Sequence, residues 1–198
     1  MSETKSTLRD RRRAETQRGI QAQAVRLFVE HGYQSVTVNQ VAEAAGVSPM
    51  TLYRHFATKE DLVLVDQLDE LIADHIAATP TDGSPSHRIG RALIETAAAL
   101  TGSAEGADDL LLDRLKLMIS TPALRARHLD RQYAFQQAIV DALGDADSDA
   151  ETEFRVRASA GACLAALHVA LTRWAAEDGR SDLPDLIATA LSAAIGDR

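Results

Sequence analysis

Apolar residues recur at helical spacing along nearly the whole chain. In the first such stretch, Ile20 and Phe28 fall on one face of a helix, and Gly32 suits the left-handed backbone position that ends one. This pattern predicts a first helix over residues 16–30. The residues before it are polar and charged without an apolar face, and they predict a flexible arm over residues 1–15.

Two short helices are predicted next, each with its own start signal. Thr37 can cap the first of them, and Gln40 completes a capping box. Gly46 tolerates the positive φ that ends this helix. Ser48 can cap the second helix, and Pro49 fits its first position because the missing N–H costs nothing there.

The rest of the chain carries the same helical pattern. Thr58 and Asp61 form a further capping box, which predicts a fourth helix from there to about Ala78. The fold class that follows is all-α, with about nine helices and no strand. Beyond a loop rich in proline and glycine, the last five predicted helices cover residues 86–101, 108–119, 123–143, 151–178 and 183–196.

The composition supports this fold class. Hydrophobic residues make up 45% of the chain and aromatic residues 4%, and an alanine-rich apolar fraction favours helix over sheet. The formal charge is −8, yet residues 1–61 hold nine Lys/Arg against seven Asp/Glu. A mildly basic head on an acidic body suits a protein that touches nucleic acid at one end, although chance asymmetry accounts for the count equally well.

The cysteine, histidine and hydropathy patterns indicate where in the cell the protein works and whether it holds a metal or a cofactor. Cys163 is the single cysteine, so no internal disulfide forms. The longest uncharged run, residues 158–172, is fifteen residues long, shorter than the ~20 that a membrane helix needs. We therefore expect a cytoplasmic protein without a membrane partner. No two histidines lie four apart on a helix, so we expect no metal and no cofactor.

Residues 38–57 have the features of a helix-turn-helix, a motif that reads DNA. The small Ala42 lets the two helices touch, Gly46 suits the turn, and Val47 and Leu52 hold the second helix. That second helix is short and exposed on one face, which fits the ~12 Å major groove. The alternative is a helical hairpin without a DNA role.

The flanks make the DNA-binding interpretation specific. The stretches LFVEHGY at 27–33, TVNQVAEAAGVS at 37–48, TLYRHF at 51–56 and KEDL at 59–62 closely resemble the tetracycline-repressor (TetR) family. The match runs without a gap over about residues 16–65, a third of the chain. This resemblance implies an all-α homodimer that binds a palindromic operator in double-stranded DNA.

The resemblance and the side chains together give a set of DNA contacts. The resemblance places Ser48, Met50 and Thr51 nearest the bases, although the family often has a small residue where Met50 stands. Arg54 can reach a guanine or a phosphate, and Arg11 to Arg13 could reach the backbone or the minor groove. The expected DNA-binding residues are Thr37, Ser48, Met50, Thr51, Tyr53, Arg54, His55 and Lys59.

The C-terminal part suggests an effector. Residues 120–127 and the region of Trp174 more weakly resemble regulators related to the mycofactocin regulator, a group whose ligands include acyl-CoA-like molecules in some members. The resemblance therefore implies a small-molecule effector of that kind. The expected domains are a flexible arm (1–15), a helix-turn-helix DNA-binding domain (16–62) and a ligand-binding and dimerisation domain (63–198).

An effector pocket would be mostly apolar with a few placed polar groups. Ordinary core packing is the alternative for each candidate. Arg114 and Lys116 could meet an anionic ligand, but a solvated helix face explains them as well or better. The candidate pocket residues are Leu111, Leu115, Met118, Tyr133, Gln137, Leu164, Leu167 and His168.

The last two predicted helices are rich in alanine, and small residues let helices approach closely. A two-fold interface of four helices fits this pattern, with Trp174 as an anchor. Packing within one chain is the alternative. The candidate dimer-interface residues are Ala162, Ala166, Ala170, Trp174, Ala190 and Ala194.

These patterns together predict a ligand-responsive transcriptional regulator, a repressor that a small, largely apolar effector releases from its operator. One rival is a helical carrier or enzyme without specific DNA recognition, but the sequence offers it no catalytic constellation. A second rival is a module that binds DNA without sequence preference or does not bind it. An enzyme is not expected.

Overall fold

The computed structural model describes residues 3–64, 67–79, 83–101, 107–143 and 149–196. Within these ranges every regular element is helical, so the predicted all-α fold class is confirmed. The elements are α1 (Glu3–His31), α2 (Val38–Ala44), α3 (Pro49–His55), the 3-10 turn η1 (Glu60–Leu62), α4 (Gln67–Ala78), α5 (Pro85–Thr101), α6 (Ala107–Ser120), α7 (Pro122–Leu143), α8 (Ala150–Ala176) and α9 (Leu183–Ile195).

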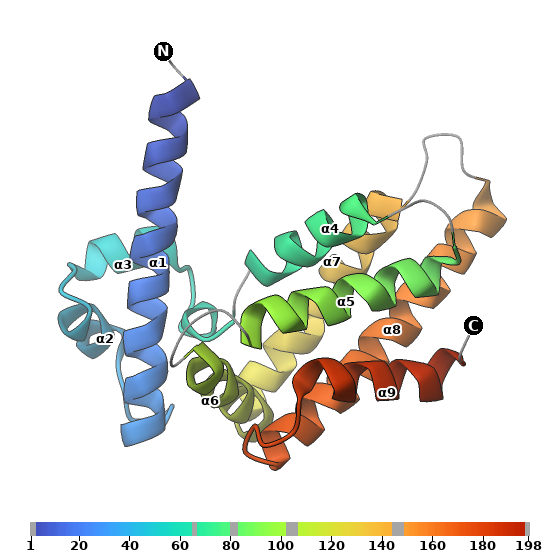
Figure 1. Cartoon of the computed structure of the whole chain (residues 1–198). Coiled ribbons are helices and arrows are strands. Elements are labelled where there is room, and N and C mark those ends of the chain that lie inside the picture. Colours follow the sequence, from blue (N-terminus) through green and yellow to red (C-terminus); the bar gives the residue numbers. More distant parts are fainter. Residues whose placement is uncertain (1–2, 65–66, 80–82, 102–106, 144–148, 197–198) are drawn as a thin grey trace.

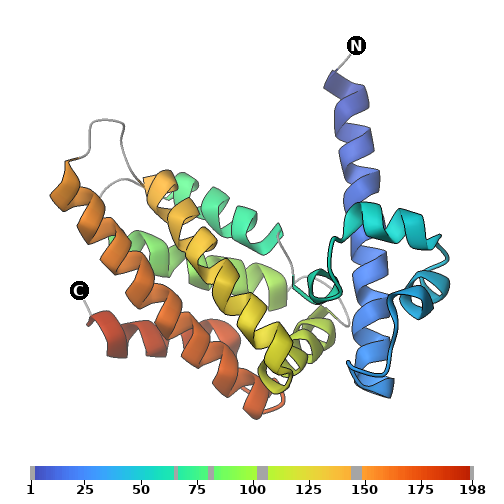
Figure 2. The same cartoon turned by 180° about the vertical axis from the view of Figure 1, so that it is seen from behind.

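The helices form two groups that lie side by side. α1, α2 and α3 make a small head, and α4 to α9 make a larger body (Figure 1). Viewed from behind, α7 and α8 run along the length of the body (Figure 2). α8 packs against α5, α7 and α9, so it forms the spine of this part.

The core of the head extends into the body. Ile20, Phe28 and Leu52 are each about 1% exposed and meet inside the three-helix head. Leu117 of α6 and Leu124 of α7 belong to the same cluster and are buried as well. The head is therefore seated on the turn between α6 and α7 by apolar contact, and movement of that turn acts on the head core.

The first helix is longer than its apolar pattern predicts. α1 begins at Glu3, where the sequence analysis expected a flexible arm over residues 1–15. Residues 3–15 contain no glycine or proline and are rich in residues that favour helix, so the helix continues without an apolar face. Its N-terminal part projects past the rest of the head (Figure 1).

The predicted fourth helix is also different in the structure. The Thr58–Asp61 capping box forms, with the Thr58 N–H donating to the Asp61 carboxylate at 2.9 Å. It starts the single 3-10 turn η1, and α4 begins later, at Gln67. The capping signal was correct for a helical start, but it contained no information about how long the helix runs.

α8 is long and apolar enough to cross a membrane by length and composition. In the structure it instead lines the core of the body, where Ala160, Cys163 and Trp174 are buried. Cys163 is fully buried, and its thiol donates to the Ser86 carbonyl at 3.6 Å. Burial raises the pKa of this thiol to about 11, so it stays protonated near neutral pH and packs as a small apolar group.

Candidate functional site

The two helices of the DNA-binding motif are fixed by local caps. The Gln40 N–H donates to the Thr37 hydroxyl at 3.3 Å, and the Thr37 N–H donates to the Gln40 side chain at 2.7 Å. Gly46 takes a φ of +67° at the turn. Ser48 caps α3 by accepting the N–H of Thr51 at 3.1 Å. The start of each helix is therefore set by residues within three positions of it.

α3 is anchored by one side chain and exposed on its outer face. Leu52 is 1% exposed and points into the head core, whereas Met50 and Tyr53 are 80% and 55% exposed. Arg54 is exposed on the same helix, and Thr51 is half-buried. α3 thus presents apolar, hydroxyl and cationic groups together, a combination suited to base edges and phosphates.

His55 ends α3 close to the basic part of α1. Its side chain is half-buried, and its Nδ1 is buried without a hydrogen-bond partner among the described residues. Burial, then the charges of Arg13 and Arg54, lower the pKa of His55. The effect of Arg13 shows that the N-terminal part of α1 brings a cation beside α3. The sequence analysis placed that cation on an arm instead of a helix.

Lys59 is engaged within the head. Its ammonium lies over the ring of Tyr33, 4.4 Å from the centroid, and over that of Phe28 at 5.3 Å. It also donates a hydrogen bond to the Tyr33 carbonyl. Burial lowers the pKa of Lys59. Its contact with DNA stays a prediction, and in this structure Lys59 stabilises the junction between α1 and η1.

The body contains a cavity of about 140 Å³, lined from α4, α6, α7, α8 and the segment after η1. A dry engineered cavity of about 150 Å³ holds benzene, so this one fits a small apolar group without rearrangement. A larger effector has to separate the lining helices. Six of the predicted pocket residues line the cavity: Leu111, Leu115, Met118, Leu164, Leu167 and His168.

Two predicted pocket residues lie elsewhere. Tyr133 is 79% exposed, and Gln137 is exposed and donates to Asp141 at 2.8 Å. Both residues are on the outer face of α7, so they are withdrawn as pocket candidates. The sequence analysis chose the wrong face of this helix because α7 is amphipathic only weakly and polar residues occur all around it.

The face of α7 that lines the cavity was missed. His128, Gln132 and Phe135 lie four and then three positions apart and reach the cavity together with Arg131. This is ordinary helical spacing, but three of the four side chains are polar, and an apolar periodicity search passes over them. Arg114 of α6 lines the cavity as well, although a solvated position had been favoured for it.

Burial lowers the pKa values of two polar groups in the lining, Arg114 and His128. It lowers the pKa of Arg114 to about 10. The rings of His128 and His168 stack with centroids 5.9 Å apart. Burial, followed by His168 and Arg131, lowers the pKa of His128. Lys116, the other cation considered for a ligand, instead points outward and pairs with Asp178 at 2.6 Å.

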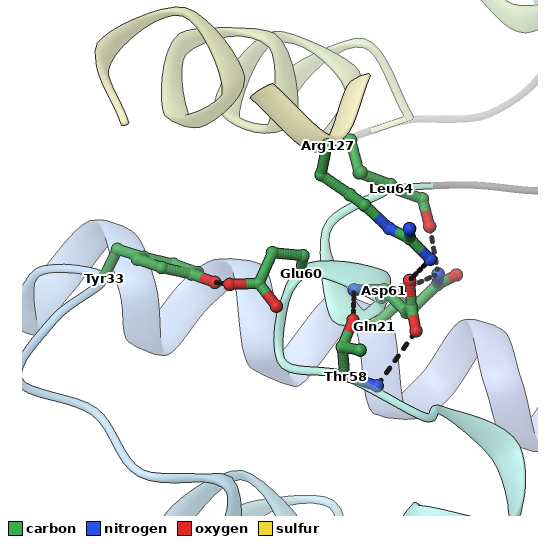
Figure 3. A network of polar contacts seen from close by, with 7 residues as sticks. All are labelled: Gln21, Tyr33, Thr58, Glu60, Asp61, Leu64 and Arg127. Carbon is green, nitrogen blue, oxygen red and sulfur yellow. Dashed lines mark hydrogen bonds and ion pairs between the residues drawn. The ribbon is translucent and has the colours of Figure 1, made fainter. Parts of the chain in front are cut away.

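A polar network joins the head to the body (Figure 3). Gln21 of α1 is 6% exposed, and its amide donates to the carbonyls of Asp61 and Leu64 at 3.2 Å each. The Asp61 carboxylate accepts the Thr58 N–H and pairs with Arg127 of α7 at 3.7 Å. η1 is thus held between α1 on one side and α7 on the other.

The predicted dimer residues divide into two groups. Ala166, Ala170 and Trp174 are 2–5% exposed within the single chain, so they pack in the core and are withdrawn as interface residues. The Trp174 indole N–H donates to the Ser181 carbonyl at 2.9 Å. The three that reach the surface at least in part are Ala162, Ala190 and Ala194.

The outer face of α8 carries exposed apolar side chains instead. Phe154 is 65% exposed and Val169 is 63% exposed. Ala158 and Ala165 lie between them and are exposed too. The four positions are spaced four, seven and four apart, so they form one stripe along the helix.

Comparison with known proteins identifies the architecture. Residues 20–65 match the family model described as bacterial regulatory proteins, tetR family, and residues 84–195 match the model described as MftR C-terminal domain. The second match alone covers more than half of the chain. The head and the body are therefore both recognised as parts of one type of regulator.

Individual proteins agree with this. The HTH-type transcriptional regulator TcmR of Streptomyces glaucescens is 30% identical over 76% of this chain and 69% of its own length. The putative mycofactocin biosynthesis transcriptional regulator MftR of Mycobacterium tuberculosis is 24% identical over 86% and 85%. The structure of Thermus thermophilus FadR in complex with lauroyl-CoA shares the fold, with a TM-score of 0.56 and 19% identity over 92% and 95%. The chain belongs to the TetR family of DNA-binding transcriptional regulators.

Proposed function

We propose that this protein is a repressor that binds a palindromic operator as a homodimer and that a small, largely apolar effector in the body cavity releases it. The observation that carries this proposal is that one helix serves both parts. α6 lines the cavity through Leu111, Leu115 and Met118, and its Leu117 belongs to the core of the head. A change at the cavity therefore has a direct route to α3.

The mechanism is a shift between two states of the dimer. In one state the two heads lie about one helical turn of DNA apart, ~34 Å, and enter successive major grooves. The effector favours another spacing, and it does so only by the difference in its affinity for the two states. Because the cavity is small, an effector larger than a benzene-sized group is expected to move α4 or α6 when it enters.

The effector class follows from the lining. Apolar side chains from α4, α6, α7 and α8 surround the cavity, with a few polar groups on α6, α7 and α8. An acyl-CoA-like molecule, with an apolar chain and an anionic end, belongs to this class. The likeness to the lauroyl-CoA complex supports the shared fold, and the lining of the cavity supports the effector class.

DNA recognition is tested by selecting operators from random duplexes with the purified full chain. Arg54→Ala in α3 is expected to lose about 1–3 kcal/mol of operator binding if the guanidinium reads a base, and to lose discrimination at one position. The matched control is Arg155→Ala, an exposed arginine of α8 in an ion pair with Glu151. A chain without preference for any duplex over random competitor at moderate salt contradicts the proposed function.

The homodimer is proposed to form through the exposed stripe of α8 with the neighbouring surface of α9. Val169→Glu places a charge on that stripe, and it is expected to shift the dimer toward monomer while the monomer stays folded, because Val169 makes no core contact. Analytical ultracentrifugation measures the shift. An unchanged dimer would place the interface elsewhere.

A further inference from the structure

Arg114 is a cation that lines the cavity and has no ion-pair partner among the described residues. Burial is the cause of its lowered pKa, and no carboxylate of the described residues forms an ion pair with it. Its Nε is buried and has no hydrogen-bond partner in the described structure. A buried charge is normally paired, since an unpaired one is costly to desolvate. Among the described residues, none therefore supplies a counter-charge for Arg114.

The lining of the cavity around Arg114 holds no described carboxylate. Among the described residues that line it there is no Asp or Glu, and its polar groups include the Arg114 guanidinium and the stacked His128–His168 pair. The remainder of the lining is largely apolar. Such a site favours a molecule with an apolar body and one anionic group.

Arg114 also touches the DNA-binding head. One of its terminal nitrogens donates to the Oε1 of Gln21 at 3.4 Å, a long bond between α6 and α1. The same Gln21 side chain donates to the carbonyls of Asp61 and Leu64 through its Nε2, as Figure 3 shows. Leu64 itself lines the cavity. A single buried amide thus links the cavity, α1 and the segment after η1.

We propose that the effector carries an anionic group that binds the Arg114 guanidinium in place of Gln21. Through this exchange, the charge of the effector changes the contact between α6 and the DNA-binding head. This rests on the proposed function, in which the effector enters the cavity. A carboxylate or other oxyanion forms shorter and stronger hydrogen bonds to a guanidinium than a neutral amide does. The competition therefore favours the anion, and Gln21 loses its bond to α6.

The consequence is a change at the seat of the head. With Arg114 turned to the anion, Gln21 still holds Asp61 and Leu64 but no longer ties α1 to α6. The apolar contacts of Leu117 and Leu124 and the Asp61–Arg127 ion pair then hold the head on the body. A neutral molecule of the same shape also has to move the lining helices when it enters, but it does not compete with Gln21 for Arg114, and it is a weaker inducer.

The test compares octanoate with 1-octanol, which share an eight-carbon chain and differ in charge at neutral pH. Isothermal titration calorimetry on the full chain is expected to show octanoate binding about tenfold or more tightly than 1-octanol, as for other charge-assisted contacts. Arg114→Met keeps an unbranched, flexible side chain and removes the charge. It is expected to abolish this preference while 1-octanol binding is retained.

Two further variants separate the specific contact from a general loss of charge. Gln21→Glu places a carboxylate beside Arg114 within the chain, and it also removes the amide that donates to the Asp61 and Leu64 carbonyls. It is expected to weaken octanoate binding about tenfold more than 1-octanol binding, which reports any general disturbance of the cavity. Arg125→Met removes an exposed arginine of α7 that does not line the cavity, and it is expected to leave both affinities unchanged. Equal binding of the two probes, binding of neither, or a preference that survives in Arg114→Met overturns the proposal.

Operator binding, measured in parallel by fluorescence anisotropy, separates this inference from the proposed function. Octanoate is expected to lower the operator affinity of the unaltered chain more than 1-octanol does, and to have no effect on Arg114→Met. If the ligand-free chain binds its operator but octanoate has no advantage, the inference about Arg114 fails alone. If the ligand-free chain has no specific operator affinity, the proposed function fails.

Discussion

The head and the body differ in how their functional surfaces are built. In the head, caps and a turn within twelve residues, from Thr37 to Ser48, fix the start of α3. In the body, the cavity draws side chains from four helices and from the segment after η1, far apart in the sequence. A DNA-reading helix is therefore specified locally, whereas an effector site is specified by how distant helices pack.

The head and the body also differ in how well they tolerate substitutions. The exposed face of α3 can vary in its side chains without altering the head core, because Leu52 alone of its residues is buried in that core. Most apolar residues of the cavity wall, Leu115 and Leu164 among them, also belong to the core of the body. Specificity for DNA can thus change independently of stability, and specificity for the effector cannot do so to the same degree.

The largest expected effect comes from breaking the anchor of α3. Leu52→Ala removes a side chain that is 1% exposed, and it is expected to cost about 2–5 kcal/mol of stability through lost burial and a cavity. Operator binding should fall with it, because α3 loses its seat. Thermal and urea denaturation measure the free energy of unfolding.

Met50→Ala on the same helix is the matched control. Met50 is 80% exposed, so its removal is expected to change stability by less than about 0.5 kcal/mol while it changes operator preference. If Met50→Ala destabilised the chain as much as Leu52→Ala, α3 would be packed against the head by a different face from the one described.

Substitution of two glycines tests the turn of the head, with the next largest expected change in stability. Gly46 has a φ of +67°, and Gly46→Ala is expected to cost about 1–2 kcal/mol because of the left-handed backbone, although space for the new methyl is open. Gly19 lies inside α1 with open space around it. Gly19→Ala is expected to stabilise by about 0.5–1 kcal/mol. Equal effects of the two substitutions, read from denaturation midpoints, would contradict the turn geometry.

The same contrast explains what the sequence could predict. The caps at Thr37 and Ser48 and the turn at Gly46 are signals within a few residues, and the structure has each of them where it was expected. The later helices also agree closely, because their breaks are marked by glycine and proline; the breaks at residues 102–106 and 144–148 lie outside the described residues. Local chemistry was therefore sufficient for the fold class and for α3, but not for the starts of α1 and α4.

Prediction failed where a residue depends on its partner helix. Trp174 and Ala170 have the small-and-aromatic pattern of an interface, but they meet other helices of the same chain. Tyr133 is aromatic on a body helix and yet faces solvent, whereas the charged Arg114 lies at the cavity. The type of a residue does not show which way its side chain points around a helix. On α7 and α8 this direction decides whether the side chain lies in the core, at the cavity or in solvent.

Substitution of Trp174, with an effect of intermediate size, tests whether this residue lies in the core or in the dimer interface. Trp174→Phe removes the indole N–H that donates to the Ser181 carbonyl, and it is expected to cost about 1–2 kcal/mol of stability from the lost hydrogen bond and contact. The dimerisation constant, measured by ultracentrifugation, should stay the same, in contrast to Val169→Glu. Weakened dimerisation without loss of stability would return Trp174 to the interface.

The smallest effect concerns pH and the polar wall of the cavity. In the unfolded chain His128 titrates near 6.5, and in the folded chain burial, with His168 and Arg131 nearby, lowers its pKa. Between the two pKa values the unfolded chain binds more protons, so stability is full above about pH 6.5 and decreases as the pH falls toward the folded value. The melting temperature of the unaltered chain should therefore fall more between pH 7 and pH 5 than that of His128→Gln.

His31→Gln, at an exposed position of α1, is the control and should keep the slope of the unaltered chain. If His128→Gln kept that slope as well, the body would hold His128 in a more open setting than the cavity wall, and the apolar character of the effector site would have to be revised.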